Sequence, residues 1–528
     1  MTQADAQHRH DLGRRPLVAA FAVVFLPAFV AIATWSLVMP RDSGPDEPSH
    51  VVHAAAVDRG QWVGAPIKGF PGFTLVHVPA AFSYLAGIEQ ERCFQSPPTR
   101  PASCQPPWLA GSGSVASGTY TGRYPPLYYA VVGLPTLVSS SLPAFYAMRL
   151  LSAVASALFV GLAGAVAAVW SRNRMLPVGI LLAVTPMALY SAAVVNPSGL
   201  EICAALCLWV SGMVLVREHL DDPPAGLVVI VAVSAAVLAL SRPISPLWLG
   251  IIGATLLAVC DARAAVALLG RSRLVQVALG SVALVTVLAV AWVLAVHSFD
   301  VQRGLVGLPA HASALDVLRA SVLREGTWLQ EMVGIFGSHE TVAPLVTYVV
   351  WGAGITTLGV VSMLLGRRRD VTALVGLVVA CVVIPIALQF LHARNLGIVW
   401  QGRYTLPAAV GIPILGTVIV GSSALPSRLR HAFEAGVVLA VTVGAFLAFA
   451  EALRRYAVGI DGPILFVRPK WQPVGGVAPW LVINLVATSL LAGALWWTQH
   501  RSANSSSILV GVRDAPRDLG DQGPASVE

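Results

Sequence analysis

The stretch from residue 14 to residue 48 reads RRPLVAAFAVVFLPAFVAIATWSLVMPRDSGPDEP. It contains an apolar run from Leu17 to Met39, which is long enough to cross the hydrocarbon core of a membrane as a helix. Arg14 and Arg15 precede the run, as positive charges do on the cytoplasmic side of a span. The run is too long and too uniformly apolar for a cleaved signal peptide, so we interpret it as a retained signal-anchor helix.

The composition extends this interpretation to the whole chain. Of 528 residues, 56 % are hydrophobic and 11 % are charged, whereas a soluble domain has roughly 25 % charged residues. The mean hydropathy is +0.74. Apolar runs of about twenty residues, bounded by charges, recur along the length. These features exclude a soluble globular protein and predict an all-α, polytopic integral membrane protein.

The formal net charge of +8 does not predict nucleic-acid binding, because the basic residues are dispersed among the loops. Cytoplasmic loops carry an excess of positive charge, so we expect the arginine clusters to be cytoplasmic. The clusters are Arg14–Arg15, Arg172 with Arg174, Arg263 to Arg273, Arg367 to Arg369, and Arg428 with Arg430.

With this constraint, about twelve transmembrane helices are predicted, with both termini inside. The predicted spans are 17–39, 144–170, 176–194, 200–217, 225–241, 243–260, 273–296, 343–365, 371–391, 404–421, 431–451 and 478–498. The run at 125–141 is short and contains Pro135, and counting it as a span would place Arg172 and Arg174 outside. We therefore interpret it as a re-entrant or interfacial helix.

The predicted organisation has three parts. A cytoplasmic N-terminus (1–16) precedes a transmembrane domain (17–498), and a tail (499–528) rich in Ser, Gly, Asp and Arg is expected to be disordered. Loops too long for simple connections are usually functional or disordered. Three such outer loops are predicted, at about 40–143, 297–342 and 452–477. In the first, apolar periodicity at 48–58 and 75–88 predicts short helices on the membrane surface.

Two of the cysteines, Cys93 and Cys104, lie outside the predicted spans. If the first outer loop faces an oxidising compartment, they can form a disulfide that closes the loop between them. The remaining cysteines are expected to be apolar packing residues inside helices. These are Cys203, Cys207, Cys260 and Cys381.

An acidic pair, Asp46-Glu47, follows the first span. In a helix that starts here, Asp46, His50 and His53 share one face. Three interpretations stay open from the residues alone. Asp46 can cap the helix, with Pro48 in its first turn; Glu47 and His50 can supply two metal ligands; or a carboxylate at the membrane face can act as a general base towards an acceptor hydroxyl.

Other polar residues are predicted at the same face. Glu201 heads a helix after an Asn-Pro-Ser-Gly turn, and Arg242 lies in a short outer turn. Arginines on the outer side are unusual, because positive charge is normally enriched in cytoplasmic loops, so their position calls for an explanation. For Arg403, both snorkelling to lipid phosphates and binding of a substrate phosphate stay open. Snorkelling is expected for Arg454 and Arg455.

Several motifs in this order resemble known membrane enzymes. The acidic motif after the first span is similar to that of the GT-C superfamily of membrane glycosyltransferases. So are Tyr124-Pro125-Pro126-Leu127-Tyr128, Arg149-Leu150-Leu151-Ser152-Ala153 and Arg403-Tyr404-Thr405-Leu406-Pro407. More narrowly, Pro-Asp-Glu-Pro-Ser-His at 45–50, Asn-Pro-Ser-Gly-Leu-Glu at 196–201 and Gln-Gly-Arg-Tyr at 401–404 resemble a bacterial family of predicted membrane proteins, domain of unknown function 2142, regarded as GT-C-like. The resemblance covers roughly residues 15–500.

The resemblance implies a GT-C-like fold whose long first extracytoplasmic loop carries interfacial helices. It also implies a glycosyltransferase (hexosyl- or pentosyltransferase) that acts on the outer face of the cytoplasmic membrane. Such an enzyme moves a sugar from a polyprenyl-phosphate donor to a cell-envelope glycan, lipid or protein. Asp46 best matches the catalytic acid of the superfamily, with Glu47 second. The resemblance and the outer position together suggest a set of substrate-binding residues. These are His50, Arg123, Tyr124, Glu201, Arg242, Arg394, Gln401, Arg403 and Tyr404.

The second loop lacks the Asp-Asp or Asp-x-Asp metal motif of some superfamily members, so no cofactor is certain. A divalent metal on Glu47 and His50 is the alternative. The rival function is a flippase or transporter of lipid-linked sugars, with a non-catalytic envelope membrane protein as a third reading. Transporters often contain internal repeats and ionisable groups in mid-span. Here no duplication is evident, and the ionisable groups gather at the outer ends of the predicted helices.

Overall fold

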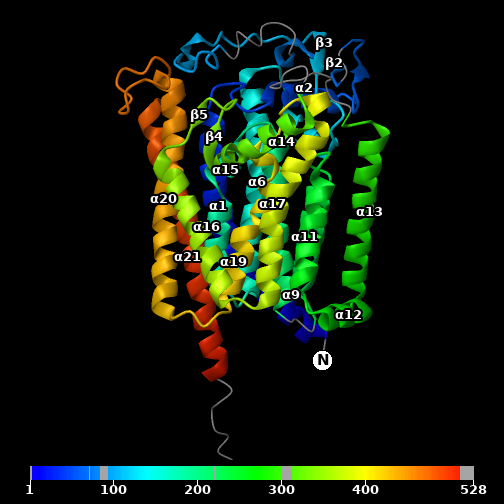
Figure 1. Ribbon diagram of the computed structural model, residues 1–528, viewed down its shortest axis with the longest axis vertical. Helices are drawn as coiled ribbons and strands as arrows, with labels where there is room; N and C mark the ends of the chain where they lie inside the picture. The colour runs from blue at the N-terminus through cyan, green and yellow to red at the C-terminus, as the bar shows by residue number, and fades with distance from the viewer. Residues whose placement is uncertain (1–2, 70–71, 84–92, 219–221, 300–311, 512–528) are drawn as a thin grey trace, which may run out of the picture.

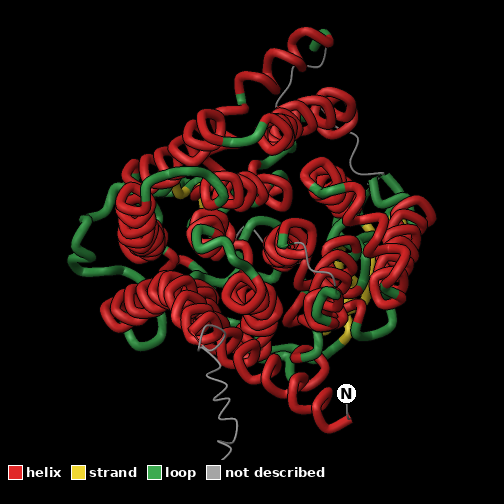
Figure 2. The backbone as a smooth tube through the Cα atoms, turned by 90° about the horizontal axis from the view of Figure 1, so that it is seen from below, coloured by secondary structure: helices red, strands yellow, loops and turns green. Residues whose placement is uncertain are grey.

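The computed structural model describes residues 3–69, 72–83, 93–218, 222–299 and 312–511, without the side chains of residues 3–15, 394–396 and 499–511. Long helices run between two ends of the molecule (Figure 1). Viewed along their axes, they fill the cross-section of the bundle (Figure 2). We call the end with α2 (Glu47–Val57) and the strands the loop end. The opposite end, where α12 (Ala262–Arg271) lies, is the α12 end.

Eight helices in the described part of the chain are long and apolar enough to cross a membrane. They are α1 (Gln3–Val38), α6 (Leu142–Trp170), α9 (Pro197–Arg217), α13 (Arg273–Ala295), α16 (Leu345–Leu365), α17 (Arg368–Leu396), α20 (Ser427–Val458) and α21 (Val477–Gly511). The chain is therefore an all-α, multi-pass membrane protein, as predicted.

The predicted count of twelve spans is not confirmed. Two bent pairs raise the count to ten if each pair is one span: α7 (Leu176–Ala183) with α8 (Pro186–Ala193), and α11 (Ser245–Val259) with α12. Two further predicted spans are shorter apolar helices, α10 (Ala225–Ala239) and α18 (Leu406–Ala409) with α19 (Gly411–Gly421). Pro186 explains the 62° bend between α7 and α8, because proline has no N–H to continue the helical ladder.

The most extensive helix contact in the described part of the bundle is that of α1 with α6, and α1 also packs against α8 and α21. Two glycines of α6 allow the close approach. A Cβ at Gly161 would lie 2.8 Å from the Cβ of Phe25, and one at Gly164 would lie 2.8 Å from Val24. Small residues at helix contacts are a general device for association in membranes, because backbones can then pack closely.

The first outer loop folds differently from the prediction at 75–88, which was wrong. This segment begins with β2 (Thr74–Pro79) and η1 (Ala80–Phe82), and residues 84–92 lie outside the described part. β2 pairs antiparallel with β1 (Ala65–Pro66) and β3 (Ser114–Thr119). Buried and less buried residues alternate along most of β2, which is the period of a strand. Pairing with a segment about forty residues away supplies the hydrogen bonds.

Helices do form at 48–58 and within 125–141, as predicted. However, every residue of α2 is buried, so α2 lies inside the loop end and not on a membrane surface. The run at 125–141 forms α4 (Leu127–Val132) and α5 (Pro135–Val138), which are too short to cross a membrane. The predicted tail also needs correction, because α21 continues to Gly511 and residues 512–528 lie outside the described part. A helix already formed in the membrane extends at little cost.

The described part of the second long outer segment also contains regular structure. Within the segment predicted at 297–342, two helices and a two-stranded sheet are described. They are α14 (Ala314–Leu323), α15 (Glu325–Gly334), β4 (Ile335–Phe336) and β5 (Thr341–Val342). The short η3 (Gly402–Tyr404) packs against α15.

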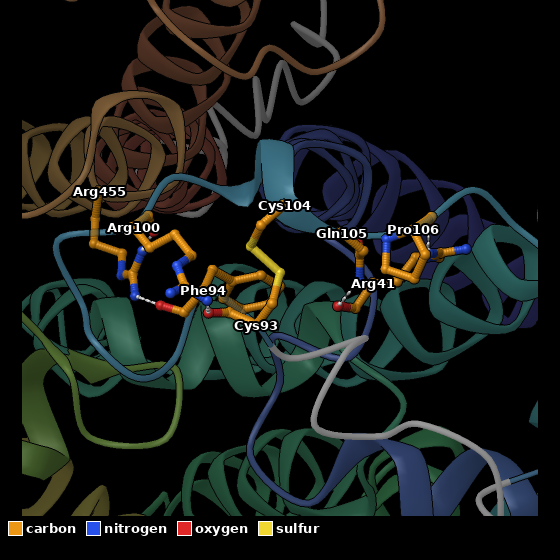
Figure 3. The surroundings of a disulfide bond; sticks show 8 residues. All are labelled: Arg41, Cys93, Phe94, Arg100, Cys104, Gln105, Pro106 and Arg455. Carbon is orange, nitrogen blue, oxygen red and sulfur yellow. Dashed lines mark hydrogen bonds between the residues drawn. A yellow bond between two sulfur atoms is a disulfide. The ribbon is translucent and has the colours of Figure 1, made fainter.

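A disulfide between Cys93 and Cys104 confirms the predicted pairing (Figure 3). Arg455 at the end of α20 anchors this closed loop, since its guanidinium donates to the carbonyl oxygens of Phe94 and Arg100. Arg455 is fully buried, so the prediction that it snorkels to lipid was wrong. Arg454 instead pairs with Glu451. Both arginines find acceptors inside the protein. The four other cysteines are buried and free, as expected.

At the α12 end, arginines tie neighbouring helices together. Arg217 at the end of α9 pairs with Asp370 at the start of α17 at 2.8 Å. Arg369 donates to the carbonyl of Ala258 on α11 at 2.6 Å. Nε of Arg172, which follows α6, lies 3.9 Å from Oε2 of Glu218, which follows α9. These contacts bring the connections after α6, α9, α11 and α16 to one end of the bundle.

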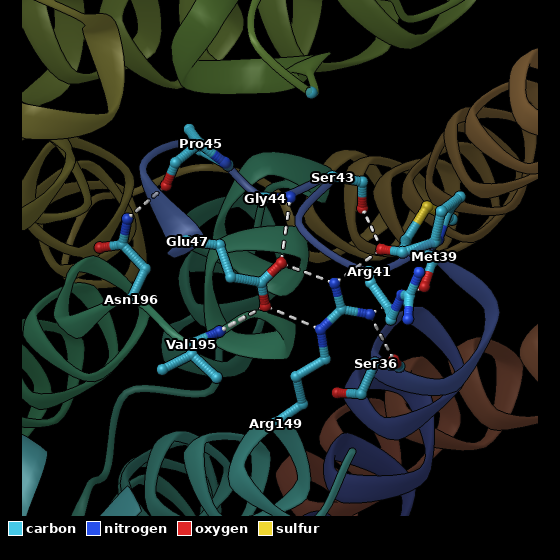
Figure 4. Close-up of polar contacts among 12 residues, drawn as sticks. Ser36, Met39, Arg41, Ser43, Gly44, Pro45, Glu47, Arg149, Val195 and Asn196 are labelled. Carbon is cyan, nitrogen blue, oxygen red and sulfur yellow. Dashed lines mark hydrogen bonds and ion pairs between the residues drawn. The ribbon is translucent and has the colours of Figure 1, made fainter. Parts of the chain in front are cut away.

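At the loop end, a buried ion pair joins Glu47 to Arg149 of α6 (Figure 4). Both side chains are 0 % exposed, with Nε–Oε1 and Nη2–Oε2 distances of 2.7 and 2.6 Å. The guanidinium also donates to the carbonyls of Ser36, Met39 and Pro40. The carboxylate accepts from the backbone N–H of residues 44 and 195. The pair thereby fixes the end of α1, the start of α2 and the turn before α9 together.

We predict that Glu47→Gln lowers the free energy of unfolding by about 3–5 kcal/mol, because it leaves the guanidinium of Arg149 buried without a counter-charge. The measurement is thermal or denaturant unfolding of the purified protein in detergent. The matched control is Glu451→Gln, which removes a partly exposed pair and should cost about 1 kcal/mol or less. The double variant Glu47→Leu with Arg149→Met should be more stable than Glu47→Gln. Equal losses for Glu47→Gln and the control would contradict the role of the pair.

Candidate functional site

A cavity of about 930 Å³ lies at the loop end. Its wall combines α2, the sheet, the turns before α9 and α11, the ends of α13 and α17, α15 and the segment before α18. Six residues predicted from the sequence line it: Asp46, His50, Tyr124, Arg242, Gln401 and Tyr404. The tertiary structure therefore gathers most of the predicted site from four distant parts of the chain.

Asp46 occupies the N-cap position of α2 but does not cap it. Its backbone is left-handed, with φ 61° and ψ 4°, and its side chain makes no capping hydrogen bond. Instead Oδ1 accepts from the Tyr120 hydroxyl at 2.6 Å, and Oδ2 accepts from Nη2 of Arg403 at 2.6 Å. A non-glycine residue in this conformation costs energy and is often found at functional sites. Here the conformation turns the carboxylate away from the helix and into the cavity wall.

Glu47, the second predicted acid, does not line the cavity. Its two oxygens accept from Arg149 and from two backbone N–H groups, and its side chain is fully buried. An acid in this position cannot reach a substrate hydroxyl in the cavity. The geometry therefore assigns Glu47 to the ion pair and distinguishes it from its neighbour Asp46.

Two ion pairs lie next to each other at the wall of the cavity. The first is Arg403 with Asp46, and the second is Arg242 with Glu201 at 3.4 Å. The guanidinium carbons of both arginines lie over the ring of Tyr404, at 4.4 Å for Arg242 and 5.1 Å for Arg403. This stacking orients the two cations, because the face of an aromatic ring attracts positive charge.

Arg242 is held less completely than Arg403. Ser245 donates to Oε1 of Glu201 at 2.6 Å, so Glu201 is shared between two donors. Nε is buried without a hydrogen-bond acceptor among the described residues in both arginines, but Arg242 lies farther from its carboxylate partner, at 3.4 Å against 2.6 Å for Arg403. Arg242 also lines the cavity, whereas Arg403 and Glu201 lie behind it. Two arginines, Arg242 and Arg324, line the cavity. Arg242 shares the ring of Tyr404 with the arginine that holds Asp46, so it is the one placed to meet an anionic group beside Asp46.

His50 is a neutral, structural member of the wall. Burial lowers the pKa of His50 to about 3, and the nearby Arg242 and Arg403 also lower it while Asp46 opposes them. Nδ1 of His50 lies 2.8 Å from the hydroxyl of Tyr129. Of the predicted face, His50 and His53 lie together, since both rings contact that of Tyr129, with centroids 5.9 and 4.2 Å away. Asp46, in contrast, precedes the helix and points to Tyr120 and Arg403. Burial also lowers the pKa of His53 to about 3.

Two predicted residues lie elsewhere. The guanidinium of Arg123 donates to the carbonyl of His297 at 3.2 Å, and Arg123 does not line the cavity. The side chain of Arg394 lies outside the described part of the chain. A metal on Glu47 and His50 does not fit, because Arg149 holds the carboxylate while the imidazole faces Tyr129. No group of three His, Cys, Asp or Glu is placed to bind a metal within the described residues.

A family model described as predicted membrane protein (DUF2142) matches residues 29–412. The chain belongs to this family. No curated protein matches it significantly. Two crystal structures of ArnT from Cupriavidus metallidurans are similar to it. The apo structure has a TM-score of 0.44 and 14 % identity, and the alignment covers 95 % of this chain and 82 % of that chain. The structure bound to undecaprenyl phosphate has a TM-score of 0.42 and 13 % identity, over 94 % and 81 %. Likeness at this level carries no inference about activity.

In this DUF2142 protein, several cavity residues had not been predicted. Glu331 of α15 accepts from Nδ1 of His339 at 3.0 Å and from the N–H of Gly402 at 2.5 Å. Tyr120, which holds Asp46, follows strand β3. Glu331 is one of several acidic residues in the second predicted outer segment, at 297–342, and no spacing singles it out. No sequence spacing indicates Tyr120, because its contact depends on the sheet.

Gly402 allows the contact that places Arg403. A Cβ at residue 402 would lie 1.9 Å from the carbonyl oxygen of Trp328 and 2.9 Å from the Cβ of Glu331. Side-chain movement cannot relieve a clash with a backbone atom. α15 and η3 must therefore separate if residue 402 has a side chain.

We predict that Gly402→Ala lowers the free energy of unfolding by about 1–3 kcal/mol, the usual cost of overpacking. Thermal unfolding in detergent measures it. The control is Gly352→Ala on α16, where a Cβ meets nothing within 4 Å; it should be neutral or stabilise by up to about 1 kcal/mol. Unchanged stability of Gly402→Ala would show that η3 does not need this close approach.

Proposed function

We propose that this protein is a membrane glycosyltransferase that uses a polyprenyl-phosphate sugar as donor, with Asp46 as the general base. One observation carries the proposal. The side chain of Asp46 does not cap α2; its left-handed backbone instead presents the carboxylate to a large cavity. The sequence resemblance to the GT-C superfamily supports the reaction class. Asp46 is also the residue that best matches the acid of the superfamily.

The two partners of Asp46 give it an orientation suited to proton transfer. Tyr120 and Arg403 each hold one carboxylate oxygen, so the side chain has a defined direction. A general base must lie within hydrogen-bond reach of the proton that it accepts. About a third of the Asp46 side chain is exposed to the cavity. We therefore infer that Arg403 positions the base, in place of the donor-phosphate role expected from the resemblance.

In the proposed reaction, an acceptor hydroxyl attacks the anomeric carbon of the donor sugar with inversion. A bond forms between the acceptor oxygen and that carbon, and the bond from the carbon to the phosphate oxygen breaks. The hydroxyl proton passes to Asp46, and polyprenyl phosphate leaves as the anion. Holding both reactants in one cavity lowers the entropic part of the barrier.

Arg242 is the proposed ligand of the donor phosphate. It lines the cavity, which Arg403 does not, and phosphate oxygens suit the planar guanidinium. Tyr404 supports the guanidinium from one face. Apolar side chains on the same cavity wall, including Phe299, Leu388 and Ile398, are suited to the first isoprene units of a lipid chain.

The proposed orientation places the loop end outside the cytoplasmic membrane. The disulfide lies at this end, and disulfides persist in oxidising compartments. The arginine-bearing connections gather at the α12 end, which suits the cytoplasmic side. The acceptor is proposed to be a glycan, lipid or protein of the cell envelope.

We predict that Asp46→Asn lowers sugar transfer by about 10²-fold or more, because the amide cannot accept the proton. The assay uses proteoliposomes, radiolabelled polyprenyl-phosphate sugars and an envelope extract as acceptor. Asp461→Asn, which changes an exposed carboxylate at the same end, is the matched control and should keep full activity. Transfer by Asp46→Asn at the wild-type rate would exclude Asp46 as the base. Lipid movement across the bilayer without any transfer would favour the flippase alternative.

We further predict that Arg242→Gln weakens donor binding, seen as a raised KM for the polyprenyl-phosphate sugar by about tenfold or more. A hydrogen bond to a charged group contributes roughly 1.5–3 kcal/mol, which sets this scale. Arg123→Gln is the control, because Arg123 does not line the cavity. An unchanged KM for Arg242→Gln would remove Arg242 from the donor site and leave the role of Asp46 untouched.

A further inference from the structure

A second cavity, of about 410 Å³, lies at the α12 end of the bundle. It is enclosed by the last residues of α9 and by α10, α11 and α13, and α12 runs across it. The wall is apolar and includes Val216, Val231, Leu257, Leu268 and Val282. This cavity is separate from the proposed active site, which lies at the loop end.

α12 has the geometry of a helix that lies along a membrane surface. It is bent by 110° from α11, and none of its residues is buried. Asp261 caps it by accepting from the N–H groups of the next turn. Arg263 and Arg271 are eight residues apart and so share one side of the helix. Apolar residues such as Leu268 face the cavity. Arg271, three residues after Leu268, also lines the cavity, so basic and apolar side chains meet at its edge. Interfacial helices combine basic and apolar residues for the same reason.

Three arginines lie on α12 or directly after it, and one of them, Arg271, lines the cavity. Arg263 and Arg271 lie on α12, Arg273 begins α13, and all three are exposed. No ion pair within the described residues involves any of them. Arg217 nearby differs, because Asp370 pairs with it. A ligand that is anionic at one end and apolar at the other would match both the apolar cavity and these three cations, which have no ion-pair partner within the described residues.

The peripheral position of α13 leaves this cavity beside the lipid. α13 stands at the edge of the bundle in Figure 1, and it packs mainly against α10. Only Val275, Ala289 and Val293 are buried along its length. A lipid chain can therefore reach the space between α13 and α11 from the bilayer without opening the core.

We propose that this cavity is a binding site for an anionic phospholipid of the leaflet at the α12 end. One acyl chain fills the apolar space, and the phosphate lies between α12 and the start of α13, against Arg271 and Arg273. Basic pockets between helices on the cytoplasmic side are a general mode of anionic-lipid recognition. The acyl chain fills the space between α13 and the rest of the bundle, which protein side chains fill only in part. This site is independent of the proposed donor site.

The test measures lipid retained by the full-length protein in native mass spectrometry, after incubation with mixed micelles of phosphatidylglycerol or phosphatidylcholine. Phosphatidylglycerol should be retained in preference. The variant Arg263→Gln, Arg271→Gln, Arg273→Gln should weaken this binding by about 100-fold, since each arginine near an anionic lipid contributes roughly fivefold. The matched control is Arg367→Gln, Arg368→Gln, Arg428→Gln, which removes the same charge from other exposed positions at this end. The control should retain the lipid.

A second pair of variants tests the acyl chain. Ala232→Phe on α10 fills the cavity, whereas Val229→Phe adds the same bulk on the same helix at a site 49 % exposed and outside the cavity. Only Ala232→Phe should lose the lipid. Equal retention of both lipids by the wild type would overturn the proposal, as would equal loss in both arginine variants. Thermal unfolding of each variant establishes that a loss of lipid does not follow from a loss of fold.

Discussion

The ion pair between Glu47 and Arg149 is the constraint on which the loop end depends. Arg149 satisfies three carbonyls at the end of α1, a place where helices leave acceptors without internal partners. Glu47 accepts from the turn before α9 as well as from Arg149. Both charges are fully buried and mutually compensated. Because the side chain of Glu47 is held inside the bundle, the side chain of its neighbour Asp46 points in another direction, towards the cavity.

A second chain of contacts extends from Asp46 to the far side of the cavity. Asp46 binds Arg403, which is 357 positions later in the chain. The preceding Gly402 donates to Glu331, and Glu331 in turn contacts His339. The base, its positioning cation and the opposite wall are thus one connected network. Its geometry depends on the close approach of η3 to α15. The candidate site is therefore assembled by long-range contacts between segments that are individually short.

The helices were predicted well wherever a long apolar run by itself indicates a transmembrane segment. Each predicted span corresponds to helical residues, because an apolar run in a membrane must satisfy its backbone internally. The disulfide was predictable because Cys93 and Cys104 are the cysteines outside the spans. The prediction failed at 75–88, where β2 forms only because β3 pairs with it. It failed again at Arg455, whose buried carbonyl acceptors belong to the distant disulfide loop.

The apolar runs in the sequence are enough to predict a multi-pass helical membrane protein in which Asp46 and Glu47 follow the first span and arginines and tyrosines return late in the chain. Hydropathy and residue order carry that information, since both are local properties. The choice between the two acids depends on the folded structure. Glu47 is buried against Arg149, whereas Asp46 meets Tyr120, Arg403 and the cavity. Two adjacent carboxylates have the same chemistry in the sequence, and their roles separate only when distant helices supply a partner for each.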